Sequence, residues 1–167
     1  GRDFSYLLWK VAMVSSDNFF QKIKFITIII MSILYTVIGL RHFSDPSLFL
    51  KIMPPYIPFH IEMVYISGFF EILFGFFLLF KKFRKTSALG LIILLIAVFP
   101  ANLYIYQNPE ILCASKLQAS IRLCFQVPLI LIAYWHSIEK SSFKYSLMCS
   151  LLFVPTLLYF LTLKIGC

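Results

Sequence analysis

A single carboxyl group, Glu71, lies in the middle of a long apolar stretch, residues 64–80, in a setting suited to proton chemistry. An acidic side chain at the centre of a membrane helix costs about 3 kcal/mol on insertion scales, so it normally faces protein or water and has a polar partner. Without a cation nearby, the carboxyl is expected to stay protonated and to donate a hydrogen bond. Beside Arg122 or water it could release and regain its proton. A structural hydrogen bond and a functional proton or ligand role are therefore both open for Glu71.

Further polar side chains gather towards one end of the apolar segments, where they could share a pocket with Glu71. They are Tyr35, His42, His60, Asn102, Arg122 and Gln126. At 1.5 Å of rise per residue, Glu71 lies roughly 15 Å below the end of its helix, and Gln126 lies about 6 to 8 Å below. We therefore expect Gln126 and Tyr35 to be the partners of Glu71, and Arg122 to reach it only if the helices tilt.

Composition places the chain among integral membrane proteins. Of its 167 residues, 60% are hydrophobic, 18% are aromatic and only 13% are charged, which exceeds what a soluble domain of this size can bury. A spanning helix needs roughly 20 predominantly apolar residues. Five segments meet this need, namely residues 23–42, 62–80, 87–106, 121–138 and 145–164. We predict an all-α membrane bundle with no room for a soluble catalytic domain.

The basic residues predict how the bundle is oriented. Ten lysines and arginines lie before the first span or in the connections that share its side, and five lie on the other side. By the positive-inside rule, the N-terminus is cytoplasmic and the C-terminus is outside. The net charge of +8 then reflects topology and contact with anionic membrane lipids. No pattern of a nucleic-acid binder is present.

The chain segments before and after the first span are both unusual. Residues 1–22 are interpreted as an interfacial segment or as residues added to the natural chain, which could begin at Met13. After the first span, four prolines fall within residues 46–58, and this loop cannot continue a helix. Because the loop is apolar, we expect it to fold back over the outer mouth of the bundle as a lid or re-entrant hairpin, with a short helix at residues 46–52.

Several motifs resemble the DoxX family of small bacterial membrane proteins, in order along residues 39–137. They are Gly-Leu-Arg-His-Phe from residue 39, Pro-Pro-Tyr-Ile-Pro from residue 54, Ser67-Gly68 with Glu71 and Gly75, Ala-Val-Phe-Pro-Ala-Asn from residue 97, and Arg122-Leu123 with Gln126. The resemblance implies a four-helix domain at residues 23–138, followed by an additional transmembrane helix at residues 139–167. Cys124 stands where the family pattern has proline, which suggests a straighter fourth span.

The resemblance also implies a redox-associated role in the bacterial cytoplasmic membrane, alongside other membrane or periplasmic subunits. A quinone-like ligand would suit the polar pocket, with His42, Asn102 or Arg122 donating hydrogen bonds to it and Glu71 supplying a proton. Whether such a protein is itself an enzyme stays open. The alternative is a non-enzymatic accessory or assembly subunit, in which the same residues hold the bundle together. Transport is less favoured, because no inverted repeat is visible.

The sequence gives little support for a metal site or for cysteine chemistry. His42 and His60 share a side, but zinc needs a third ligand and bis-histidine haem needs facing helices with room between them, so no metal ligand is predicted. No Cys-x-x-Cys motif is present. A disulfide between Cys113 and Cys124 is possible on the outer side, where Cys167 also lies, but buried or free thiols are favoured.

Overall fold

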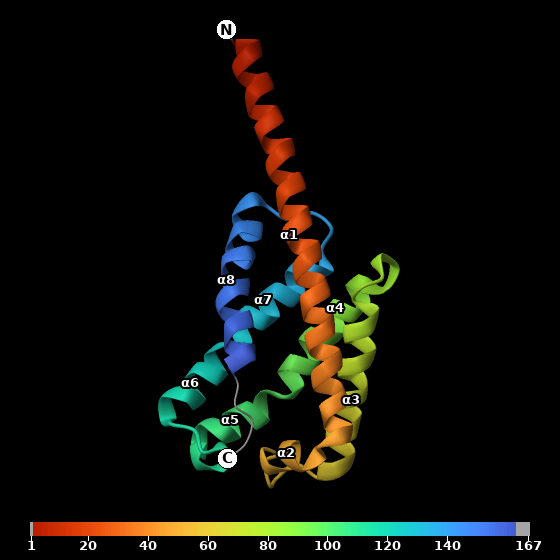
Figure 1. The fold of residues 1–167 in the computed structure, drawn as a ribbon, viewed down its shortest axis with the longest axis vertical. Helices are drawn as coiled ribbons and strands as arrows, with labels where there is room; N and C mark the ends of the chain where they lie inside the picture. The colour runs from red at the N-terminus through yellow and green to blue at the C-terminus, as the bar shows by residue number, and fades with distance from the viewer. Residues whose placement is uncertain (1, 163–167) are drawn as a thin grey trace.

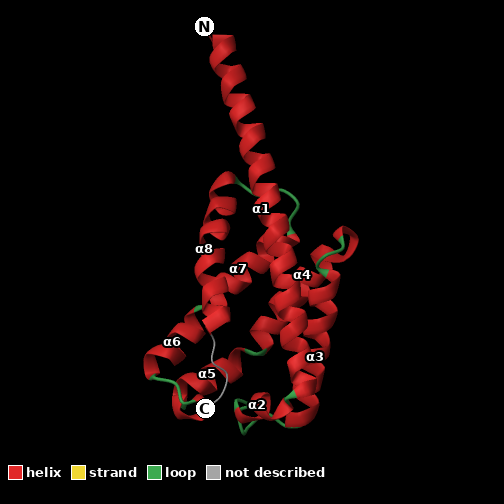
Figure 2. Ribbon diagram, viewed as in Figure 1, coloured by secondary structure: helices red, strands yellow, loops and turns green. Residues whose placement is uncertain are grey.

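The computed structural model describes residues 2–162, and all regular elements in this range are helical (Figures 1 and 2). The elements are α1 (Arg2–Ser44), α2 (Pro46–Lys51), α3 (His60–Phe77), α4 (Lys81–Ala97), α5 (Phe99–Gln107), the 3-10 helix η1 (Pro109–Leu112), α6 (Lys116–Cys124), α7 (Gln126–Ser137) and α8 (Phe143–Thr162). The short helix predicted for residues 46–52 is present as α2.

Five helical segments of the described chain are long and apolar enough to cross a membrane, as the sequence predicts. They are Phe4–Ser44, His60–Phe77, Lys81–Gln107, Lys116–Ser137 and Phe143–Leu161. The protein therefore has the architecture of a multi-pass membrane bundle. The predicted end of the fifth span at residue 164 lies outside the described residues.

Two of the five spans are broken where a proline removes a backbone donor. Pro100, near the start of α5, cannot donate to the carbonyl of Ile96, and α4 ends at Ala97. The fourth span is likewise divided at Phe125, three residues before Pro128, into α6 and α7. The expectation of a straighter fourth span, based on Cys124, is therefore wrong.

The tightest helix packing joins α1 and α3 through glycines. A Cβ atom on Gly68 would lie 2.4 Å from Cβ of His42, and one on Gly39 would lie 2.7 Å from the backbone oxygen of Gly68. Ser32 Oγ also donates to the Gly75 carbonyl at 2.6 Å. Small residues such as these let membrane helices approach closely.

The main apolar core joins α1, α4, α7 and α8. Ile28, Leu91, Ile132 and Phe153 are buried there, one from each of these helices. The fifth span packs directly on the helices of the first and fourth spans. The N-terminal half of α1, by contrast, projects beyond the other helices (Figure 1), and Phe20 is the first buried residue along it in the described chain.

Candidate functional site

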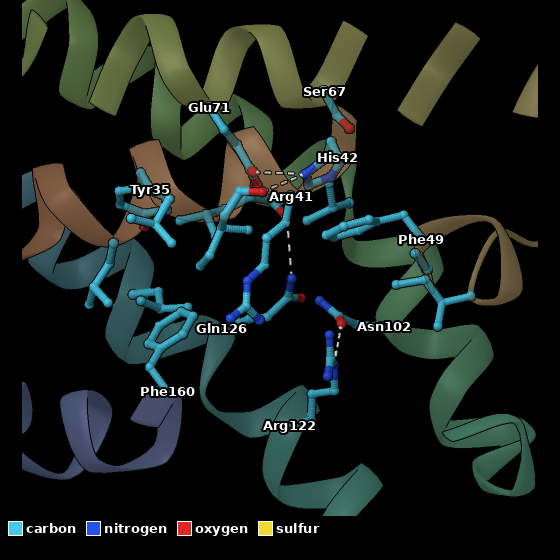
Figure 3. Close-up of a pocket in the computed structure, with 18 of the residues that line it drawn as sticks. Tyr35, Arg41, His42, Phe49, Ser67, Glu71, Asn102, Arg122, Gln126 and Phe160 are labelled. Carbon is cyan, nitrogen blue, oxygen red and sulfur yellow. Dashed lines mark hydrogen bonds and ion pairs between the residues drawn. The ribbon is translucent and has the colours of Figure 1, made fainter. Parts of the chain in front are cut away.

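A cavity of about 390 Å³, shown in Figure 3, is lined in part by residues of α2 and α5. These two helices lie at the same end of the bundle (Figure 1). The cavity is also lined by residues from α1, α3, α4, α6, α7 and α8. Six of the seven residues predicted from sequence to form a site line it, namely Tyr35, His42, Glu71, Asn102, Arg122 and Gln126. His60 does not line it, because its Nε2 is bonded to the Pro54 carbonyl at 3.1 Å in the preceding turn.

Glu71 faces His42 across the tight α1–α3 contact (Figure 3). His42 Nδ1 lies 3.4 Å from Glu71 Oε2, and the two side chains are only 7% and 13% exposed. The same Nδ1 lies closer, at 3.0 Å, to the Ile38 carbonyl. Because a carbonyl can only accept, the Nδ1 proton is committed to Ile38. Phe49 stacks on the His42 ring, with centroids 3.6 Å apart, and fixes its orientation.

Two buried oxygen atoms in this cavity have no hydrogen-bond partner among the described residues. They are Glu71 Oε2 and the hydroxyl of Tyr35. Gln126 is also buried, but its Nε2 donates to the Leu95 carbonyl at 3.3 Å. The prediction that Gln126 and Tyr35 are the hydrogen-bond partners of Glu71 is therefore wrong, and His42 lies within ion-pair distance of Glu71 instead. Buried polar atoms are usually paired, so two unpaired oxygens in one cavity call for an explanation.

Asn102 and Arg122 meet on another wall of the cavity (Figure 3). Arg122 Nε donates to Asn102 Oδ1 at 3.1 Å, which joins α6 to α5 just beyond the break in the third span. Within the described chain, the carboxyl groups lie outside ion-pair distance of Arg122. Arg122 and Glu71 thus belong to separate polar groups of one cavity, and the guanidinium keeps further N–H donors beyond the one bonded to Asn102.

Apolar side chains form most of the rest of the cavity wall. Phe49, Ile52 and Met53 come from α2 and the turn after it, and Leu129 comes from α7. A mainly apolar cavity with a few convergent polar groups is typical of sites for small lipophilic ligands. No cluster of three histidine, cysteine or acidic residues that could hold a metal ion is found in the described part of the chain.

Some lining residues were not predicted as site residues. Tyr159 and Phe160 reach the cavity from α8, and Arg41 and Ser67 reach it from α1 and α3. Arg41 and Ser67 could have been found, because each lies within one helical turn of a predicted site residue. Tyr159 and Phe160 carry no such signal in the sequence, because none of the predicted site residues lies on the fifth span.

The cysteines differ from the sequence expectation. Cys113 is disulfide-bonded, whereas Cys124 and Cys149 are free. A Cys113–Cys124 bond is therefore wrong, and so is the expectation of a free thiol at Cys113. Cys167 lies outside the described residues.

Comparison with known proteins gives one match. No curated protein and no solved structure is significantly similar to the chain. The model of one family, described as "Domain of unknown function (DUF8561)", matches residues 31–137. The match includes the six predicted site residues that line the cavity and leaves out α8 and most of α1. The chain belongs to the DUF8561 family.

Proposed function

We propose that this chain is a DoxX-like, redox-associated membrane protein that binds a quinone-like lipophilic ligand in the cavity around Glu71. The pair of buried oxygens without partners, Glu71 Oε2 and the Tyr35 hydroxyl, carries the proposal. A ligand with polar oxygens on a flat apolar ring would supply the missing hydrogen bonds and fill the space between the apolar walls.

Each polar group has a role in this proposal. The Tyr35 hydroxyl and the free N–H donors of Arg122 would bond the carbonyl oxygens of the ligand. Glu71 would supply one of the two protons that accompany two-electron reduction of a quinone to a quinol. A partner subunit would supply the electrons. The loop that carries α2 would cover the ligand from the outer side, in a bacterial cytoplasmic membrane.

The test is to extract the protein gently from its native membrane and identify co-purified small molecules by native mass spectrometry. We expect one lipophilic ligand per chain, with recovery reduced at least about tenfold in Glu71→Gln and in Arg122→Ala. The first replaces a carboxyl oxygen that faces the ligand with an amide nitrogen, and the second removes the guanidinium donors. Glu62→Gln is the matched control, since Glu62 is an exposed carboxylate on the same helix. An empty wild-type protein, or equal loss in all three variants, would contradict the proposal.

One observation favours a second function, that of an accessory or assembly subunit. Large apolar residues along the projecting half of α1 are exposed, including Phe4 at 68% and Trp9 at 58%. Such a surface is typical of a partner contact or a lipid contact. Under this alternative, purification would yield a complex with another membrane protein and no bound ligand, and Glu71→Gln would lower the recovery of that partner.

A further inference from the structure

A second cavity, of about 880 Å³, is lined mostly by basic and polar residues. Its walls come from α1, from the start of α4 and from the end of α7 with the connection that follows. These elements meet at the end of the bundle from which α1 projects, opposite α2 and α5 (Figure 1). The basic residues that line it are Lys24, Lys81, Lys82, Arg84, Lys85 and Lys140. In the described chain, Glu139 is the one acidic residue that lines it.

Lys24 is the deepest of these cations. Its side chain is only 5% exposed, its Nζ donates to the Ile138 carbonyl, and it lies 5.7 Å from the centre of the Trp135 ring. The carboxyl groups of the described residues all lie outside ion-pair distance of Lys24. A buried ammonium without an anion is unfavourable in a low-dielectric setting, and a bound anion would stabilise it.

The start of α4 adds a second attraction for anions. This helix has 17 residues, and its N-cap residue, Phe80, offers no side-chain hydrogen bond. The first N–H groups of a helix point towards its N-terminal end, where the helix dipole is positive, and together they favour a phosphate. Lys81, Lys82 and Lys85 are exposed at this end and can move to meet a ligand.

Arg84 differs from these lysines. Its Nε and one terminal nitrogen donate to the carbonyls of Leu78 and Leu79, at 3.1 and 3.0 Å. It therefore holds the turn between α3 and α4 in shape. The exposed lysines are the residues whose replacement tests binding without disturbing that turn.

We propose that this cavity binds a phosphate group, carried by the head group of an acidic phospholipid or by a soluble phosphate compound. Several ammonium groups and a helix N-terminus can satisfy the oxygens of one phosphate together, which suits phosphate better than a single carboxylate. Phe25 and Ile28 also line the cavity, and Phe25 is exposed, so an attached acyl chain would find an apolar surface beside the head group.

The experiment measures lipid retention by native mass spectrometry after incubation with dioleoyl phosphatidylglycerol or dioleoyl phosphatidylcholine. The test variant is Lys81→Gln/Lys82→Gln/Lys85→Gln. Its matched control, Lys10→Gln/Lys22→Gln/Lys144→Gln, removes the same charge from exposed lysines that do not line the cavity. We expect the wild type and the control to retain more phosphatidylglycerol than phosphatidylcholine. The test variant should retain at least about tenfold less phosphatidylglycerol than the wild type.

Inorganic pyrophosphate, added to the delipidated protein, distinguishes the two sources of phosphate. If pyrophosphate raises the Tm of the wild type and displaces phosphatidylglycerol, the site accepts soluble phosphates. If phosphatidylglycerol is retained and pyrophosphate has no effect, the ligand is a lipid head group. Equal loss of retention in the two triple variants would overturn the proposal, because attraction would then depend on net charge alone. The absence of both lipid preference and pyrophosphate binding would overturn it as well.

Discussion

At the scale of single residues, Glu71 is the group whose behaviour separates a structural role from a functional one. Its Oε2 is buried and has no hydrogen-bond partner among the described residues, although His42 Nδ1 lies 3.4 Å away, so the carboxyl adds little to the stability of the protein without ligand. Glu71→Leu fills similar space with apolar atoms. We predict that it raises the unfolding free energy of the ligand-free protein by about 1 to 3 kcal/mol, and raises its Tm accordingly. Thermal unfolding in detergent measures this.

Glu62→Leu is the control for that prediction. Glu62 is an exposed carboxylate of the same helix, and such replacements usually change stability by less than about 0.5 kcal/mol. A clear fall in Tm for Glu71→Leu alone would mean that Glu71 is a structural hydrogen-bond partner, and the ligand hypothesis would lose its main support.

A second prediction concerns the hydrogen-bonded pair of Arg122 and Asn102 on the other wall of the cavity. Arg122 and Asn102 are bonded to one another and join α6 to α5. Asn102→Ala should lower unfolding free energy by about 1 to 2 kcal/mol, because it leaves the partly buried guanidinium without its one side-chain acceptor. Ser120→Ala on α6, which loses only an exposed bond to the Lys116 carbonyl, should change Tm much less. Equal effects of the two variants would contradict this role of the pair.

At the scale of elements, the α1–α3 contact determines the position of His42 beside Glu71. In Gly68→Ala the new Cβ would lie 2.4 Å from Cβ of His42 and 3.0 Å from the Gly39 carbonyl. Since both neighbours belong to or adjoin the backbone, the helices must separate. We predict a loss of about 1 to 3 kcal/mol in unfolding free energy, together with weaker ligand retention, as measured by thermal unfolding and native mass spectrometry.

Gly90→Ala is the matched substitution for this prediction. Its Cβ would meet the far edge of the Phe74 ring, at 2.5 Å, and a side chain can rotate where a backbone cannot. The cost should therefore be smaller than at Gly68. A larger loss at Gly90 than at Gly68 would show that backbone approach between α1 and α3 is not the limiting contact.

The same elements show how far sequence reasoning extends. The five apolar helices and the short helix α2 follow from composition and spacing, because apolar length and the positions of prolines act locally. The neighbours of Glu71 do not follow, since they depend on how far the helices tilt and cross. Simple depth counting selected Gln126, but the break at Phe125 and the bond to Leu95 take its amide elsewhere. The contribution of α8 to the cavity is likewise a tertiary effect with no local signal.

At the scale of the whole molecule, α1 is much longer than the bundle it supports. Its 43 residues extend over about 65 Å at 1.5 Å per residue, roughly twice the thickness of the hydrocarbon layer. Residues 4–15 are all exposed. We predict that deleting residues 2–15 changes the unfolding free energy of the purified protein by less than about 0.5 kcal/mol, as measured by thermal unfolding. A loss comparable with that of Gly68→Ala would mean that this half of α1 packs on the bundle.

The orientation of the molecule decides which membrane leaflet each cavity faces. The positive-inside rule predicts that the proposed phosphate cavity lies on the cytoplasmic side and that the Glu71 cavity lies towards the outer leaflet. Cys124→Ser removes the exposed free thiol, and single cysteines can then be added at Tyr56, which is 71% exposed between α2 and α3, and at Lys82. In intact cells, a membrane-impermeant maleimide should label Tyr56→Cys at once and Lys82→Cys only after lysis. The reverse pattern would place the basic cavity on the outer side. The acidic lipids of the cytoplasmic leaflet could then not reach it, and a soluble phosphate compound would be the ligand to test.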